Sequence, residues 1–146
     1  MTKTYVITGS TSGIGNAIVN ELSKDNIIFA GFRNEQKLKE LKFSDNENII
    51  PFFIDMTNPE SIKQASEFIK SKTKKIDTLI NIAGCVVAGA VEEIDVNDIR
   101  KQFEVNTFSH LDLTQQLLRL LKSGKIINVS SMASFGIFPF VAPYCA

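Results

Sequence analysis

The amino-acid sequence predicts an α/β fold in which a parallel sheet is covered by helices on both faces. Short runs rich in β-branched and aromatic residues alternate along the chain with longer stretches of helical spacing. Each short run is almost continuously apolar, which is typical of strands buried on both faces. Right-handed crossovers between such strands give a three-layer, doubly wound sheet, for which we expect the strand order 3-2-1-4-5.

Five strands are expected, at residues 4–8, 27–32, 49–54, 78–82 and 125–129. In this strand order the topology switches between strands 1 and 4. Ligands of doubly wound sheets bind at such a switch, outside the carboxyl ends of the strands. Residues at those strand ends are therefore the candidates for function.

Helical spacing follows each of the first four strands. Apolar residues mark one face of each of the first three helices: Ile14, Ala17, Ile18 and Leu22, then Leu38 and Leu41, then Ile62, Ala65, Phe68 and Ile69. Pro59 suits the first turn of the third helix, and Thr57 or Asn58 would cap it. The longest helix is expected at 96–122, ending before Gly124. Its inward residues would be Ile99, Phe103, Leu111, Leu117, Leu118 and Leu121.

Composition excludes several classes of partner. The 146 residues fit one domain, residues 1–146, and 16 basic residues balance 16 acidic ones. No net field then draws the protein to nucleic acid or to an anionic membrane, so small molecules are the expected partners. No signal peptide or apolar run of 18 residues is present, and we expect a cytoplasmic protein. Cys85, Cys145 and His110 form no metal-binding pattern, so we expect reduced thiols and no metal.

A glycine-rich turn, Thr8-Gly9-Ser10-Thr11-Ser12-Gly13-Ile14-Gly15, joins the first strand to the first helix. Its glycines allow a tight turn, a close approach to a pyrophosphate and close packing of helix on sheet. The N–H groups and positive dipole end of the helix would face the phosphates. A Rossmann-type dinucleotide site is therefore predicted, with Gly9, Ser10, Ser12, Gly13, Ile14 and Gly15 as cofactor-binding residues. The alternative, a Gly/Ser-rich loop without a ligand, is disfavoured by its place between strand and helix.

The spacing of this turn, TGxxxGxG, resembles the cofactor turn of the short-chain dehydrogenases/reductases. It is similar to the shorter subgroup of that family, because the extended subgroup usually has TGxxGxxG. The resemblance covers essentially the whole chain. It implies an oxidoreductase that transfers hydride between a nicotinamide cofactor and a ketone or secondary alcohol. Members commonly form dimers or tetramers, so we expect a homodimer or homotetramer of the full-length parent.

The end of the second strand distinguishes NADP(H) from NAD(H). In a Rossmann-type site, a residue about 20 positions after the glycines binds the adenosine ribose. It is an acid where the ribose has a 2′-hydroxyl and a base where it has a 2′-phosphate. Phe32 stands where NAD-dependent relatives tend to carry Asp, and Arg33 follows, as in many NADP-dependent members. A guanidinium can bind a phosphate through two hydrogen bonds. We therefore favour NADP(H) over NAD(H); alternatively, Arg33 is a solvated cation at a strand end.

Two further strand ends resemble cofactor-binding positions of the family. Asp55 and Met56 follow the third strand where an Asp side chain and the next backbone N–H hold the adenine ring. By itself, Asp55 reads more readily as a helix cap. Asn81-Ile82-Ala83-Gly84 resembles the family's NNAG motif, with Ile82 replacing the second Asn. The resemblance implies that Asn81 supports the sheet and that Ala83 and Gly84 admit the nicotinamide ribose.

The family's catalytic set is Asn, Ser, Tyr and Lys, and Asn106, Ser131 and Tyr144 match three of these positions. Asn is a poor helix former, and by itself Asn106 would be an exposed helix residue or one that bonds back to the helix backbone. The resemblance implies instead that Asn106 holds a water molecule of a proton relay. Tyr144 follows Ser131, rather than Ser130, by the family spacing of 13 positions. Ser131 would bind the substrate carbonyl oxygen, and Tyr144 would act as general acid or base.

The family's Lys comes four residues after this Tyr, beyond Ala146. We therefore expect a C-terminally incomplete sheet, truncated after strand 5, and a chain that is poorly active or inactive by itself. The fifth strand would then be an exposed, aggregation-prone edge. A non-catalytic dinucleotide-binding fragment or scaffold is the alternative function.

Overall fold

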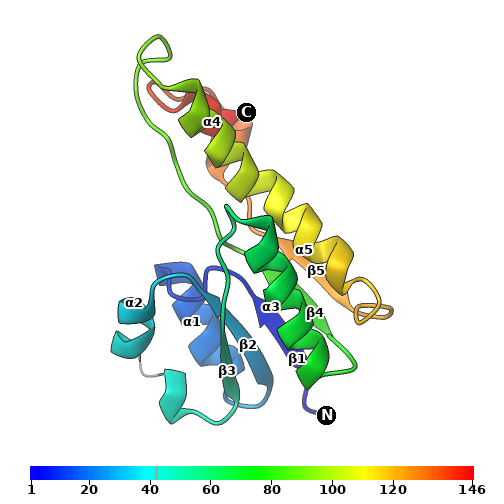
Figure 1. Ribbon diagram of the computed structural model, residues 1–146. Coiled ribbons are helices and arrows are strands. Elements are labelled where there is room, and N and C mark those ends of the chain that lie inside the picture. Colours follow the sequence, from blue (N-terminus) through cyan, green and yellow to red (C-terminus); the bar gives the residue numbers. More distant parts are fainter. Residues whose placement is uncertain (42) are drawn as a thin grey trace.

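A five-stranded parallel sheet forms the centre of the computed structural model, which describes residues 1–41 and 43–146 (Figure 1). The strands are β1 (Thr4–Ile7), β2 (Ile27–Phe32), β3 (Ile49–Phe53), β4 (Thr78–Asn81) and β5 (Lys125–Asn128). Their order, β3-β2-β1-β4-β5, confirms the predicted doubly wound topology. All strands except β2 end one residue earlier than predicted, which is within the ordinary uncertainty of element ends.

Helices cover both faces of the sheet (Figure 1). One face carries α1 (Gly13–Leu22), α2 (Glu35–Glu40) and the short 3-10 helix η1 (Phe43–Asp45). The other carries α3 (Pro59–Lys72) and a long helix built from α4 (Val96–Phe103), the π-helical turn η2 (Glu104–Phe108) and α5 (Ser109–Leu117). The 3-10 helix η3 (Met132–Phe135) and α6 (Ala142–Cys145) follow β5.

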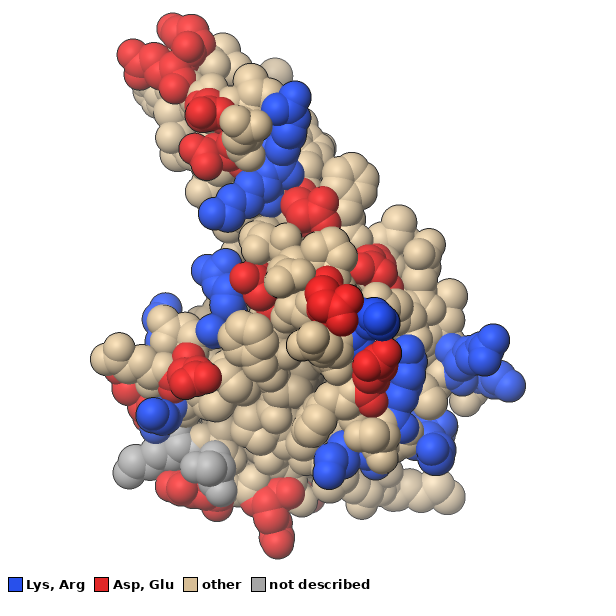
Figure 2. Space-filling view, in the orientation of Figure 1, with Lys and Arg blue, Asp and Glu red and all other residues tan. Residues whose placement is uncertain are grey.

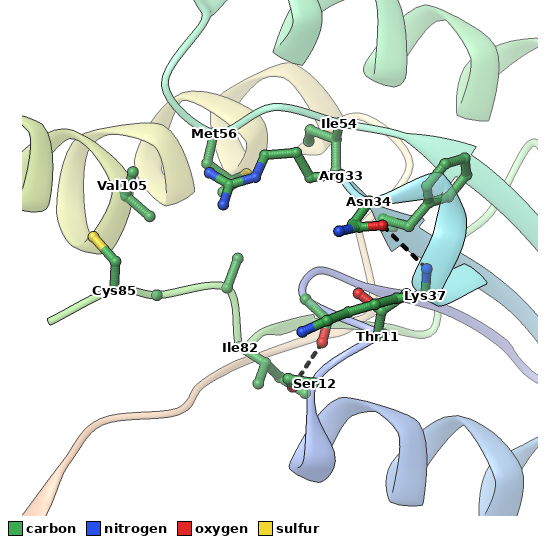
Figure 3. A pocket seen from close by; sticks show the side chains of 15 residues that line it. Thr11, Ser12, Arg33, Asn34, Lys37, Ile54, Met56, Ile82, Cys85 and Val105 are labelled. Atoms are coloured by element: carbon green, nitrogen blue, oxygen red, sulfur yellow. Dashed lines mark hydrogen bonds between the residues drawn. The ribbon is translucent and has the colours of Figure 1, made fainter. Parts of the chain in front are cut away.

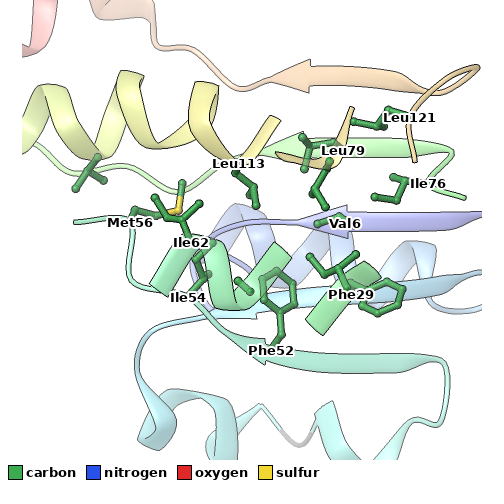
Figure 4. Close-up of a cluster of buried hydrophobic side chains, with 14 residues drawn as sticks. Val6, Phe29, Phe52, Ile54, Met56, Ile62, Ile76, Leu79, Leu113 and Leu121 are labelled. Atoms are coloured by element: carbon green, nitrogen blue, oxygen red, sulfur yellow. The ribbon is translucent and has the colours of Figure 1, made fainter. Parts of the chain in front are cut away.

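Alternating strand residues separate two apolar cores. Val6 and Phe29 face α3 and α5, whereas their neighbours Ile7 and Ile28 face α1. Figure 4 shows the first core, in which Ile62 of α3 packs with residues of four strands and the long helix. Both cores hold the sheet rigid below the strand ends that carry the predicted site.

The long helix differs from its prediction. Leu111 and Leu118 were expected to face inward, but they are 56% and 51% exposed, while Val105 and Leu113 are buried. The prediction assumed an unbroken α-helix to residue 122, whereas η2 interrupts the helix and changes which side chains face the sheet. Leu118 also lies beyond the helix end at Leu117.

The predicted face of α1 is also partly wrong. Ile14 and Ala17 are exposed, and Val19 is fully buried in their place. Ile14 lies in the first turn of the helix, beside the strand ends rather than over the sheet. At α3, Asn58 rather than Thr57 provides the cap, accepting hydrogen bonds from the N–H groups of Glu60 (3.0 Å) and Ser61 (3.4 Å).

The surface of the described residues carries mixed charge. Figure 2 shows acidic and basic side chains intermingled over the face that bears α3 and the long helix, in keeping with the neutral balance of the sequence. None of the helices described is both long and apolar enough to cross a bilayer.

Strand β5 forms one edge of the sheet and pairs only with β4 among the described strands. All four of its residues are exposed, including Ile126 and Ile127. The prediction that this strand is an exposed edge is confirmed, but its faces, which the apolar run predicted to be buried, are exposed as well. An exposed apolar edge is a template for pairing with another chain.

We expect Ile127→Lys to reduce self-association of this chain, because a charged side chain blocks edge-to-edge pairing. Light scattering coupled to size exclusion over a range of protein concentrations measures the effect. Val91→Lys is the matched control, since Val91 is exposed in a loop away from the sheet. Equal behaviour of the two variants would contradict the role of the edge.

Candidate active site

The site is built where β1 and β4 end side by side. Thr8, which follows β1, is fully buried, and its Oγ1 accepts hydrogen bonds from the N–H groups of Ile82 (3.0 Å) and Ala83 (3.2 Å). Ser10 turns toward β2, where its N–H and Oγ both donate to the Gly31 carbonyl, at 3.0 and 2.7 Å. The glycine turn is thereby fixed to the strands on both sides of it.

Two glycines of the turn are required by close contacts. Gly9 has a φ of +65°, and a Cβ there would lie 2.9 Å from the Ala83 nitrogen. A Cβ on Gly15 would collide with the backbone of Gly9. Gly13 is different, because a Cβ on it would meet nothing within 4 Å. The turn is thus closely packed at Gly9 and Gly15 and open at Gly13.

Helix α1 begins at this open position. Ser12 caps it, accepting from the Gly15 N–H (3.1 Å) while its hydroxyl donates to the Gly9 carbonyl (2.8 Å). The positive end of the helix dipole therefore faces the space in front of the strand ends. Ser12 lines both cavities that open there.

The first cavity, of about 310 Å³, lies over the ends of β1, β2 and β3 (Figure 3). Figure 3 shows Arg33, from the end of β2, and Lys37, from α2, extending their side chains into it. No carboxylate lines it within the described part of the chain. Its lining comprises Gly9, Thr11, Ser12, Gly31, Phe32, Arg33, Asn34, Lys37, Ile54, Met56, Ile82, Ala83, Gly84, Cys85 and Val105.

Lys37 is a site residue that the sequence analysis missed. Asn34 caps α2, and its Oδ1 accepts from the Lys37 N–H at 3.1 Å, which places Lys37 in the first turn. The local signal was present: an Asn two residues after a strand end, followed by a helical stretch with Lys as its third residue. It did not reveal the direction of the side chain.

Asp55 stabilises the loop after β3 and does not line the first cavity. Its Oδ1 accepts from the Thr57 N–H (2.9 Å) and the Thr57 hydroxyl (2.8 Å). Burial opposes its ionisation, but these hydrogen bonds and the positive charges of Arg33 and Lys101 together lower the pKa of Asp55. Its neighbours Ile54 and Met56 line the cavity.

The second cavity, of about 730 Å³, brings the three predicted catalytic residues together. Asn106 lies in η2, Ser131 caps η3 by accepting from the Ala133 N–H at 3.2 Å, and Tyr144 lies in α6. Gly13 and Ile14 at the start of α1 also line it. The chain segments that carry these residues are far apart in sequence, and the fold places them around one space.

Asn106 makes two hydrogen bonds to one backbone residue. Its Oδ1 accepts from the Cys85 N–H and its Nδ2 donates to the Cys85 carbonyl, both at 2.9 Å. Its side chain is therefore occupied in holding the chain after β4. His110, which also lines this cavity and to which the sequence analysis gave no role, has its Nε2 2.6 Å from the Ala83 carbonyl oxygen.

Four predicted cofactor residues, Ser10, Gly15, Asp55 and Asn81, line neither cavity, whereas all the others line at least one. Ser10, Gly15 and Asp55 hold the turns described above. Asn81 joins two strands, because its Nδ2 donates to Asn128 Oδ1 at 2.8 Å. The residues that separate the two cavities, Ala83, Gly84 and Cys85, line both.

Both Cys85 and Cys145 are free thiols. Burial raises the pKa of Cys85, and the positive charges of Lys101 and Arg33 oppose this increase.

The strand order and the glycine turn together define a doubly wound α/β protein with Rossmann topology. A sequence profile described as short chain dehydrogenase matches residues 3–146, and the chain belongs to this family of oxidoreductases.

Two curated relatives have NADPH in their names. The chain is 33% identical to an NADPH-dependent 3-dehydrocapnine reductase from Ornithobacterium rhinotracheale, over 95% of this chain and 53% of that protein. It is 30% identical to an NADPH-dependent 1-acyldihydroxyacetone phosphate reductase from Saccharomyces cerevisiae, over 99% and 50%. The chain thus spans about half the length of the curated relatives it matches.

Solved structures agree with the fold. A short chain dehydrogenase/reductase from Saccharomyces cerevisiae superposes with a TM-score of 0.87 at 32% identity, covering 97% of this chain and 58% of that one. The KRED1-Pglu enzyme gives a TM-score of 0.89 at 30% identity, covering 98% and 62%.

The lowered pKa of Asp55 predicts a pH-dependent contribution to stability. The ionised carboxylate stabilises the fold above the ordinary Asp pKa of about 3.9, and this contribution is lost as pH falls through the lower folded value. We expect wild type to exceed Asp55→Asn in free energy of unfolding at pH 7, and the difference to shrink below pH 4. Urea titrations from pH 7 to pH 3 measure it.

Asp25→Asn is the control for net charge, because Asp25 is exposed. A difference between wild type and Asp55→Asn that is independent of pH would contradict this account.

Proposed function

We propose that this chain is the cofactor-binding part of an NADP(H)-dependent oxidoreductase that transfers hydride between the nicotinamide and a ketone or secondary alcohol. The observation that carries the choice of cofactor is the pair Arg33 and Lys37 in the first cavity, whose described lining has no carboxylate. Two cations suit a 2′-phosphate, whereas a 2′-hydroxyl is bound by an acid. The NADPH in the names of two relatives supports the same choice.

The residues present fit a dinucleotide. Arg33 and Lys37 would hold the 2′-phosphate, and the start of α1 at Ser12 and Gly13, where there is room beside the backbone, would hold the pyrophosphate. Ala83 and Gly84 carry little side chain, so they would admit the nicotinamide ribose between the two cavities. When bound, NADP(H) supplies or accepts the hydride.

Ser131 and Tyr144 would act on the substrate oxygen in the second cavity. The Tyr144 hydroxyl would donate its proton to the oxygen when a ketone is reduced and remove one when an alcohol is oxidised. The Ser131 hydroxyl would donate a hydrogen bond to the same oxygen and so stabilise negative charge that develops on it. The proposal concerns the whole protein that contains this chain.

We expect Arg33→Ala and Lys37→Ala each to raise the Kd for NADPH by about 10-fold to 100-fold, because a charge-assisted hydrogen bond to the 2′-phosphate is lost. The Kd for NADH should change little, since it has no such phosphate. Titration of nicotinamide fluorescence with both cofactors measures this.

Lys39→Ala is the matched control, since Lys39 lies on the same helix and does not line the cavity. Equal losses of NADPH and NADH binding in Arg33→Ala and Lys37→Ala would show that neither residue recognises the 2′-phosphate.

In the whole protein, we expect Tyr144→Phe to lower kcat by about 10²-fold to 10⁴-fold, the usual contribution of a positioned acid or base, with the Kd for NADPH unchanged. Turnover of a panel of ketones with NADPH is the measurement. Tyr5→Phe is the matched control, because Tyr5 lies on β1 and lines neither cavity. Full turnover by Tyr144→Phe would remove Tyr144 from the mechanism, and a whole protein that binds NADPH but reduces no ketone would favour a scaffold.

A further inference from the structure

Three polar side chains of the long helix bind one extended segment, residues 83–87, which follows β4. Gln102 Oε1 accepts from the Val87 N–H at 2.5 Å, and Asn106 makes its two hydrogen bonds to Cys85. His110 Nε2 approaches the Ala83 carbonyl oxygen at 2.6 Å. We call Gln102, Asn106 and His110 the helix ladder, because they bond every second residue of the segment in turn.

The spacing of the ladder matches that of the segment. Four residues of an α-helix rise about 6 Å. Two residues of extended chain span about 6.6 Å. Since the ladder residues are four apart and their partners are two apart, the two periods stay nearly in register over both steps. Figure 1 shows the segment leaving β4 and running beside the helix toward its N-terminal end, so the two run in opposite directions.

The π-helical turn keeps the ladder on one face of the helix. In an unbroken α-helix, four residues advance 40° beyond a full turn, so two such steps would carry the third side chain about 80° out of line. In η2 the Ser109 N–H instead bonds the Glu104 carbonyl, five residues back. Such a turn holds more residues, so each residue advances less and the drift is reduced. The interruption that displaced the predicted inward face thus keeps the ladder residues closer to one line.

The ladder forms part of the wall of the second cavity, where Gln102 is buried and Asn106 and His110 are half-buried. All three residues line it, and Gln102 is only 2% exposed. A carbonyl oxygen only accepts, so Nε2 of His110 carries the hydrogen, and burial lowers the pKa of His110 and favours the neutral ring. Loss of one partner would leave a buried group of the segment without a hydrogen bond.

We propose that Gln102 and His110 are positioning residues that act with Asn106 to fix the 83–87 segment as the wall against the nicotinamide half of the cofactor. The inference rests on the proposed binding of NADP(H). The adenosine half would lie at Arg33, Lys37, Ile54 and Met56. These residues lie just after β2, in α2 and just after β3, and make no hydrogen bond to the ladder among those described. Ala83, Gly84 and Cys85 of the segment also line the first cavity, but the residues that would hold the adenosine half lie outside the segment. The ladder should therefore affect the nicotinamide half much more than the adenosine half.

The test compares NADPH with adenosine 2′,5′-bisphosphate, which carries the adenosine half alone. We expect His110→Leu to raise the Kd for NADPH about 10-fold, the effect of one lost buried hydrogen bond, and to change the Kd for the bisphosphate less than about twofold. His110→Gln should restore most of the NADPH affinity, because its side-chain amide can donate from nearly the position of Nε2. Gln115→Leu, on the exposed side of α5, is the matched control.

Equal losses for both ligands in His110→Leu, or no loss of NADPH binding, would overturn the positioning role. The retained binding of the bisphosphate also verifies that the variant is folded. A wild-type chain that binds neither ligand would instead overturn the proposed function on which the inference rests. Gln102→Leu should repeat the pattern of His110→Leu at the other end of the segment, and a different pattern would contradict the ladder.

Discussion

The buried hydroxyl of Thr8 is the contact on which both cavities depend. By accepting hydrogen bonds from the Ile82 and Ala83 N–H groups, it joins the end of β1 to the end of β4 at the point where the strand order switches. The glycine turn leaves β1 there, and the 83–87 segment leaves β4. Because Gly9 packs against Ala83 without room for a Cβ, neither segment can shift independently of the other.

The two cavities on either side of this junction differ in their chemistry. Toward β2, Arg33 and Lys37 make the first cavity positive, and the nearby carboxylate of Asp55 does not line it because its Oδ1 is engaged by Thr57. Toward the long helix, neutral hydrogen-bonding side chains form the wall of the second cavity. One end is thus suited to an anion, and the other to an oxygen that gains or loses a proton.

Much of this arrangement could be predicted because it depends on neighbouring residues. The five strands, their order and the capped start of α3 followed from apolar runs and from Asn58 and Pro59. The place of Arg33 in the first cavity could be predicted, because a residue that directly follows a strand lies at the edge of the sheet. Lys37 and His110 were not found, because their place in the cavities depends on how α2 and α5 pack on the sheet. Leu111 was misplaced because a period of 3.6 residues assumes that no turn of another type interrupts the helix.

The sequence by itself determined the doubly wound sheet, the glycine turn and the family to which the chain belongs, since each is written in short stretches whose chemistry acts locally. Only the tertiary structure decided which side chains meet. It placed Ser10, Gly15, Asp55 and Asn81 in supporting contacts, brought Asn106, Ser131 and Tyr144 around one cavity, and aligned the helix ladder with the 83–87 segment. Those contacts join residues distant in sequence, so they exist only once helices and strands have packed.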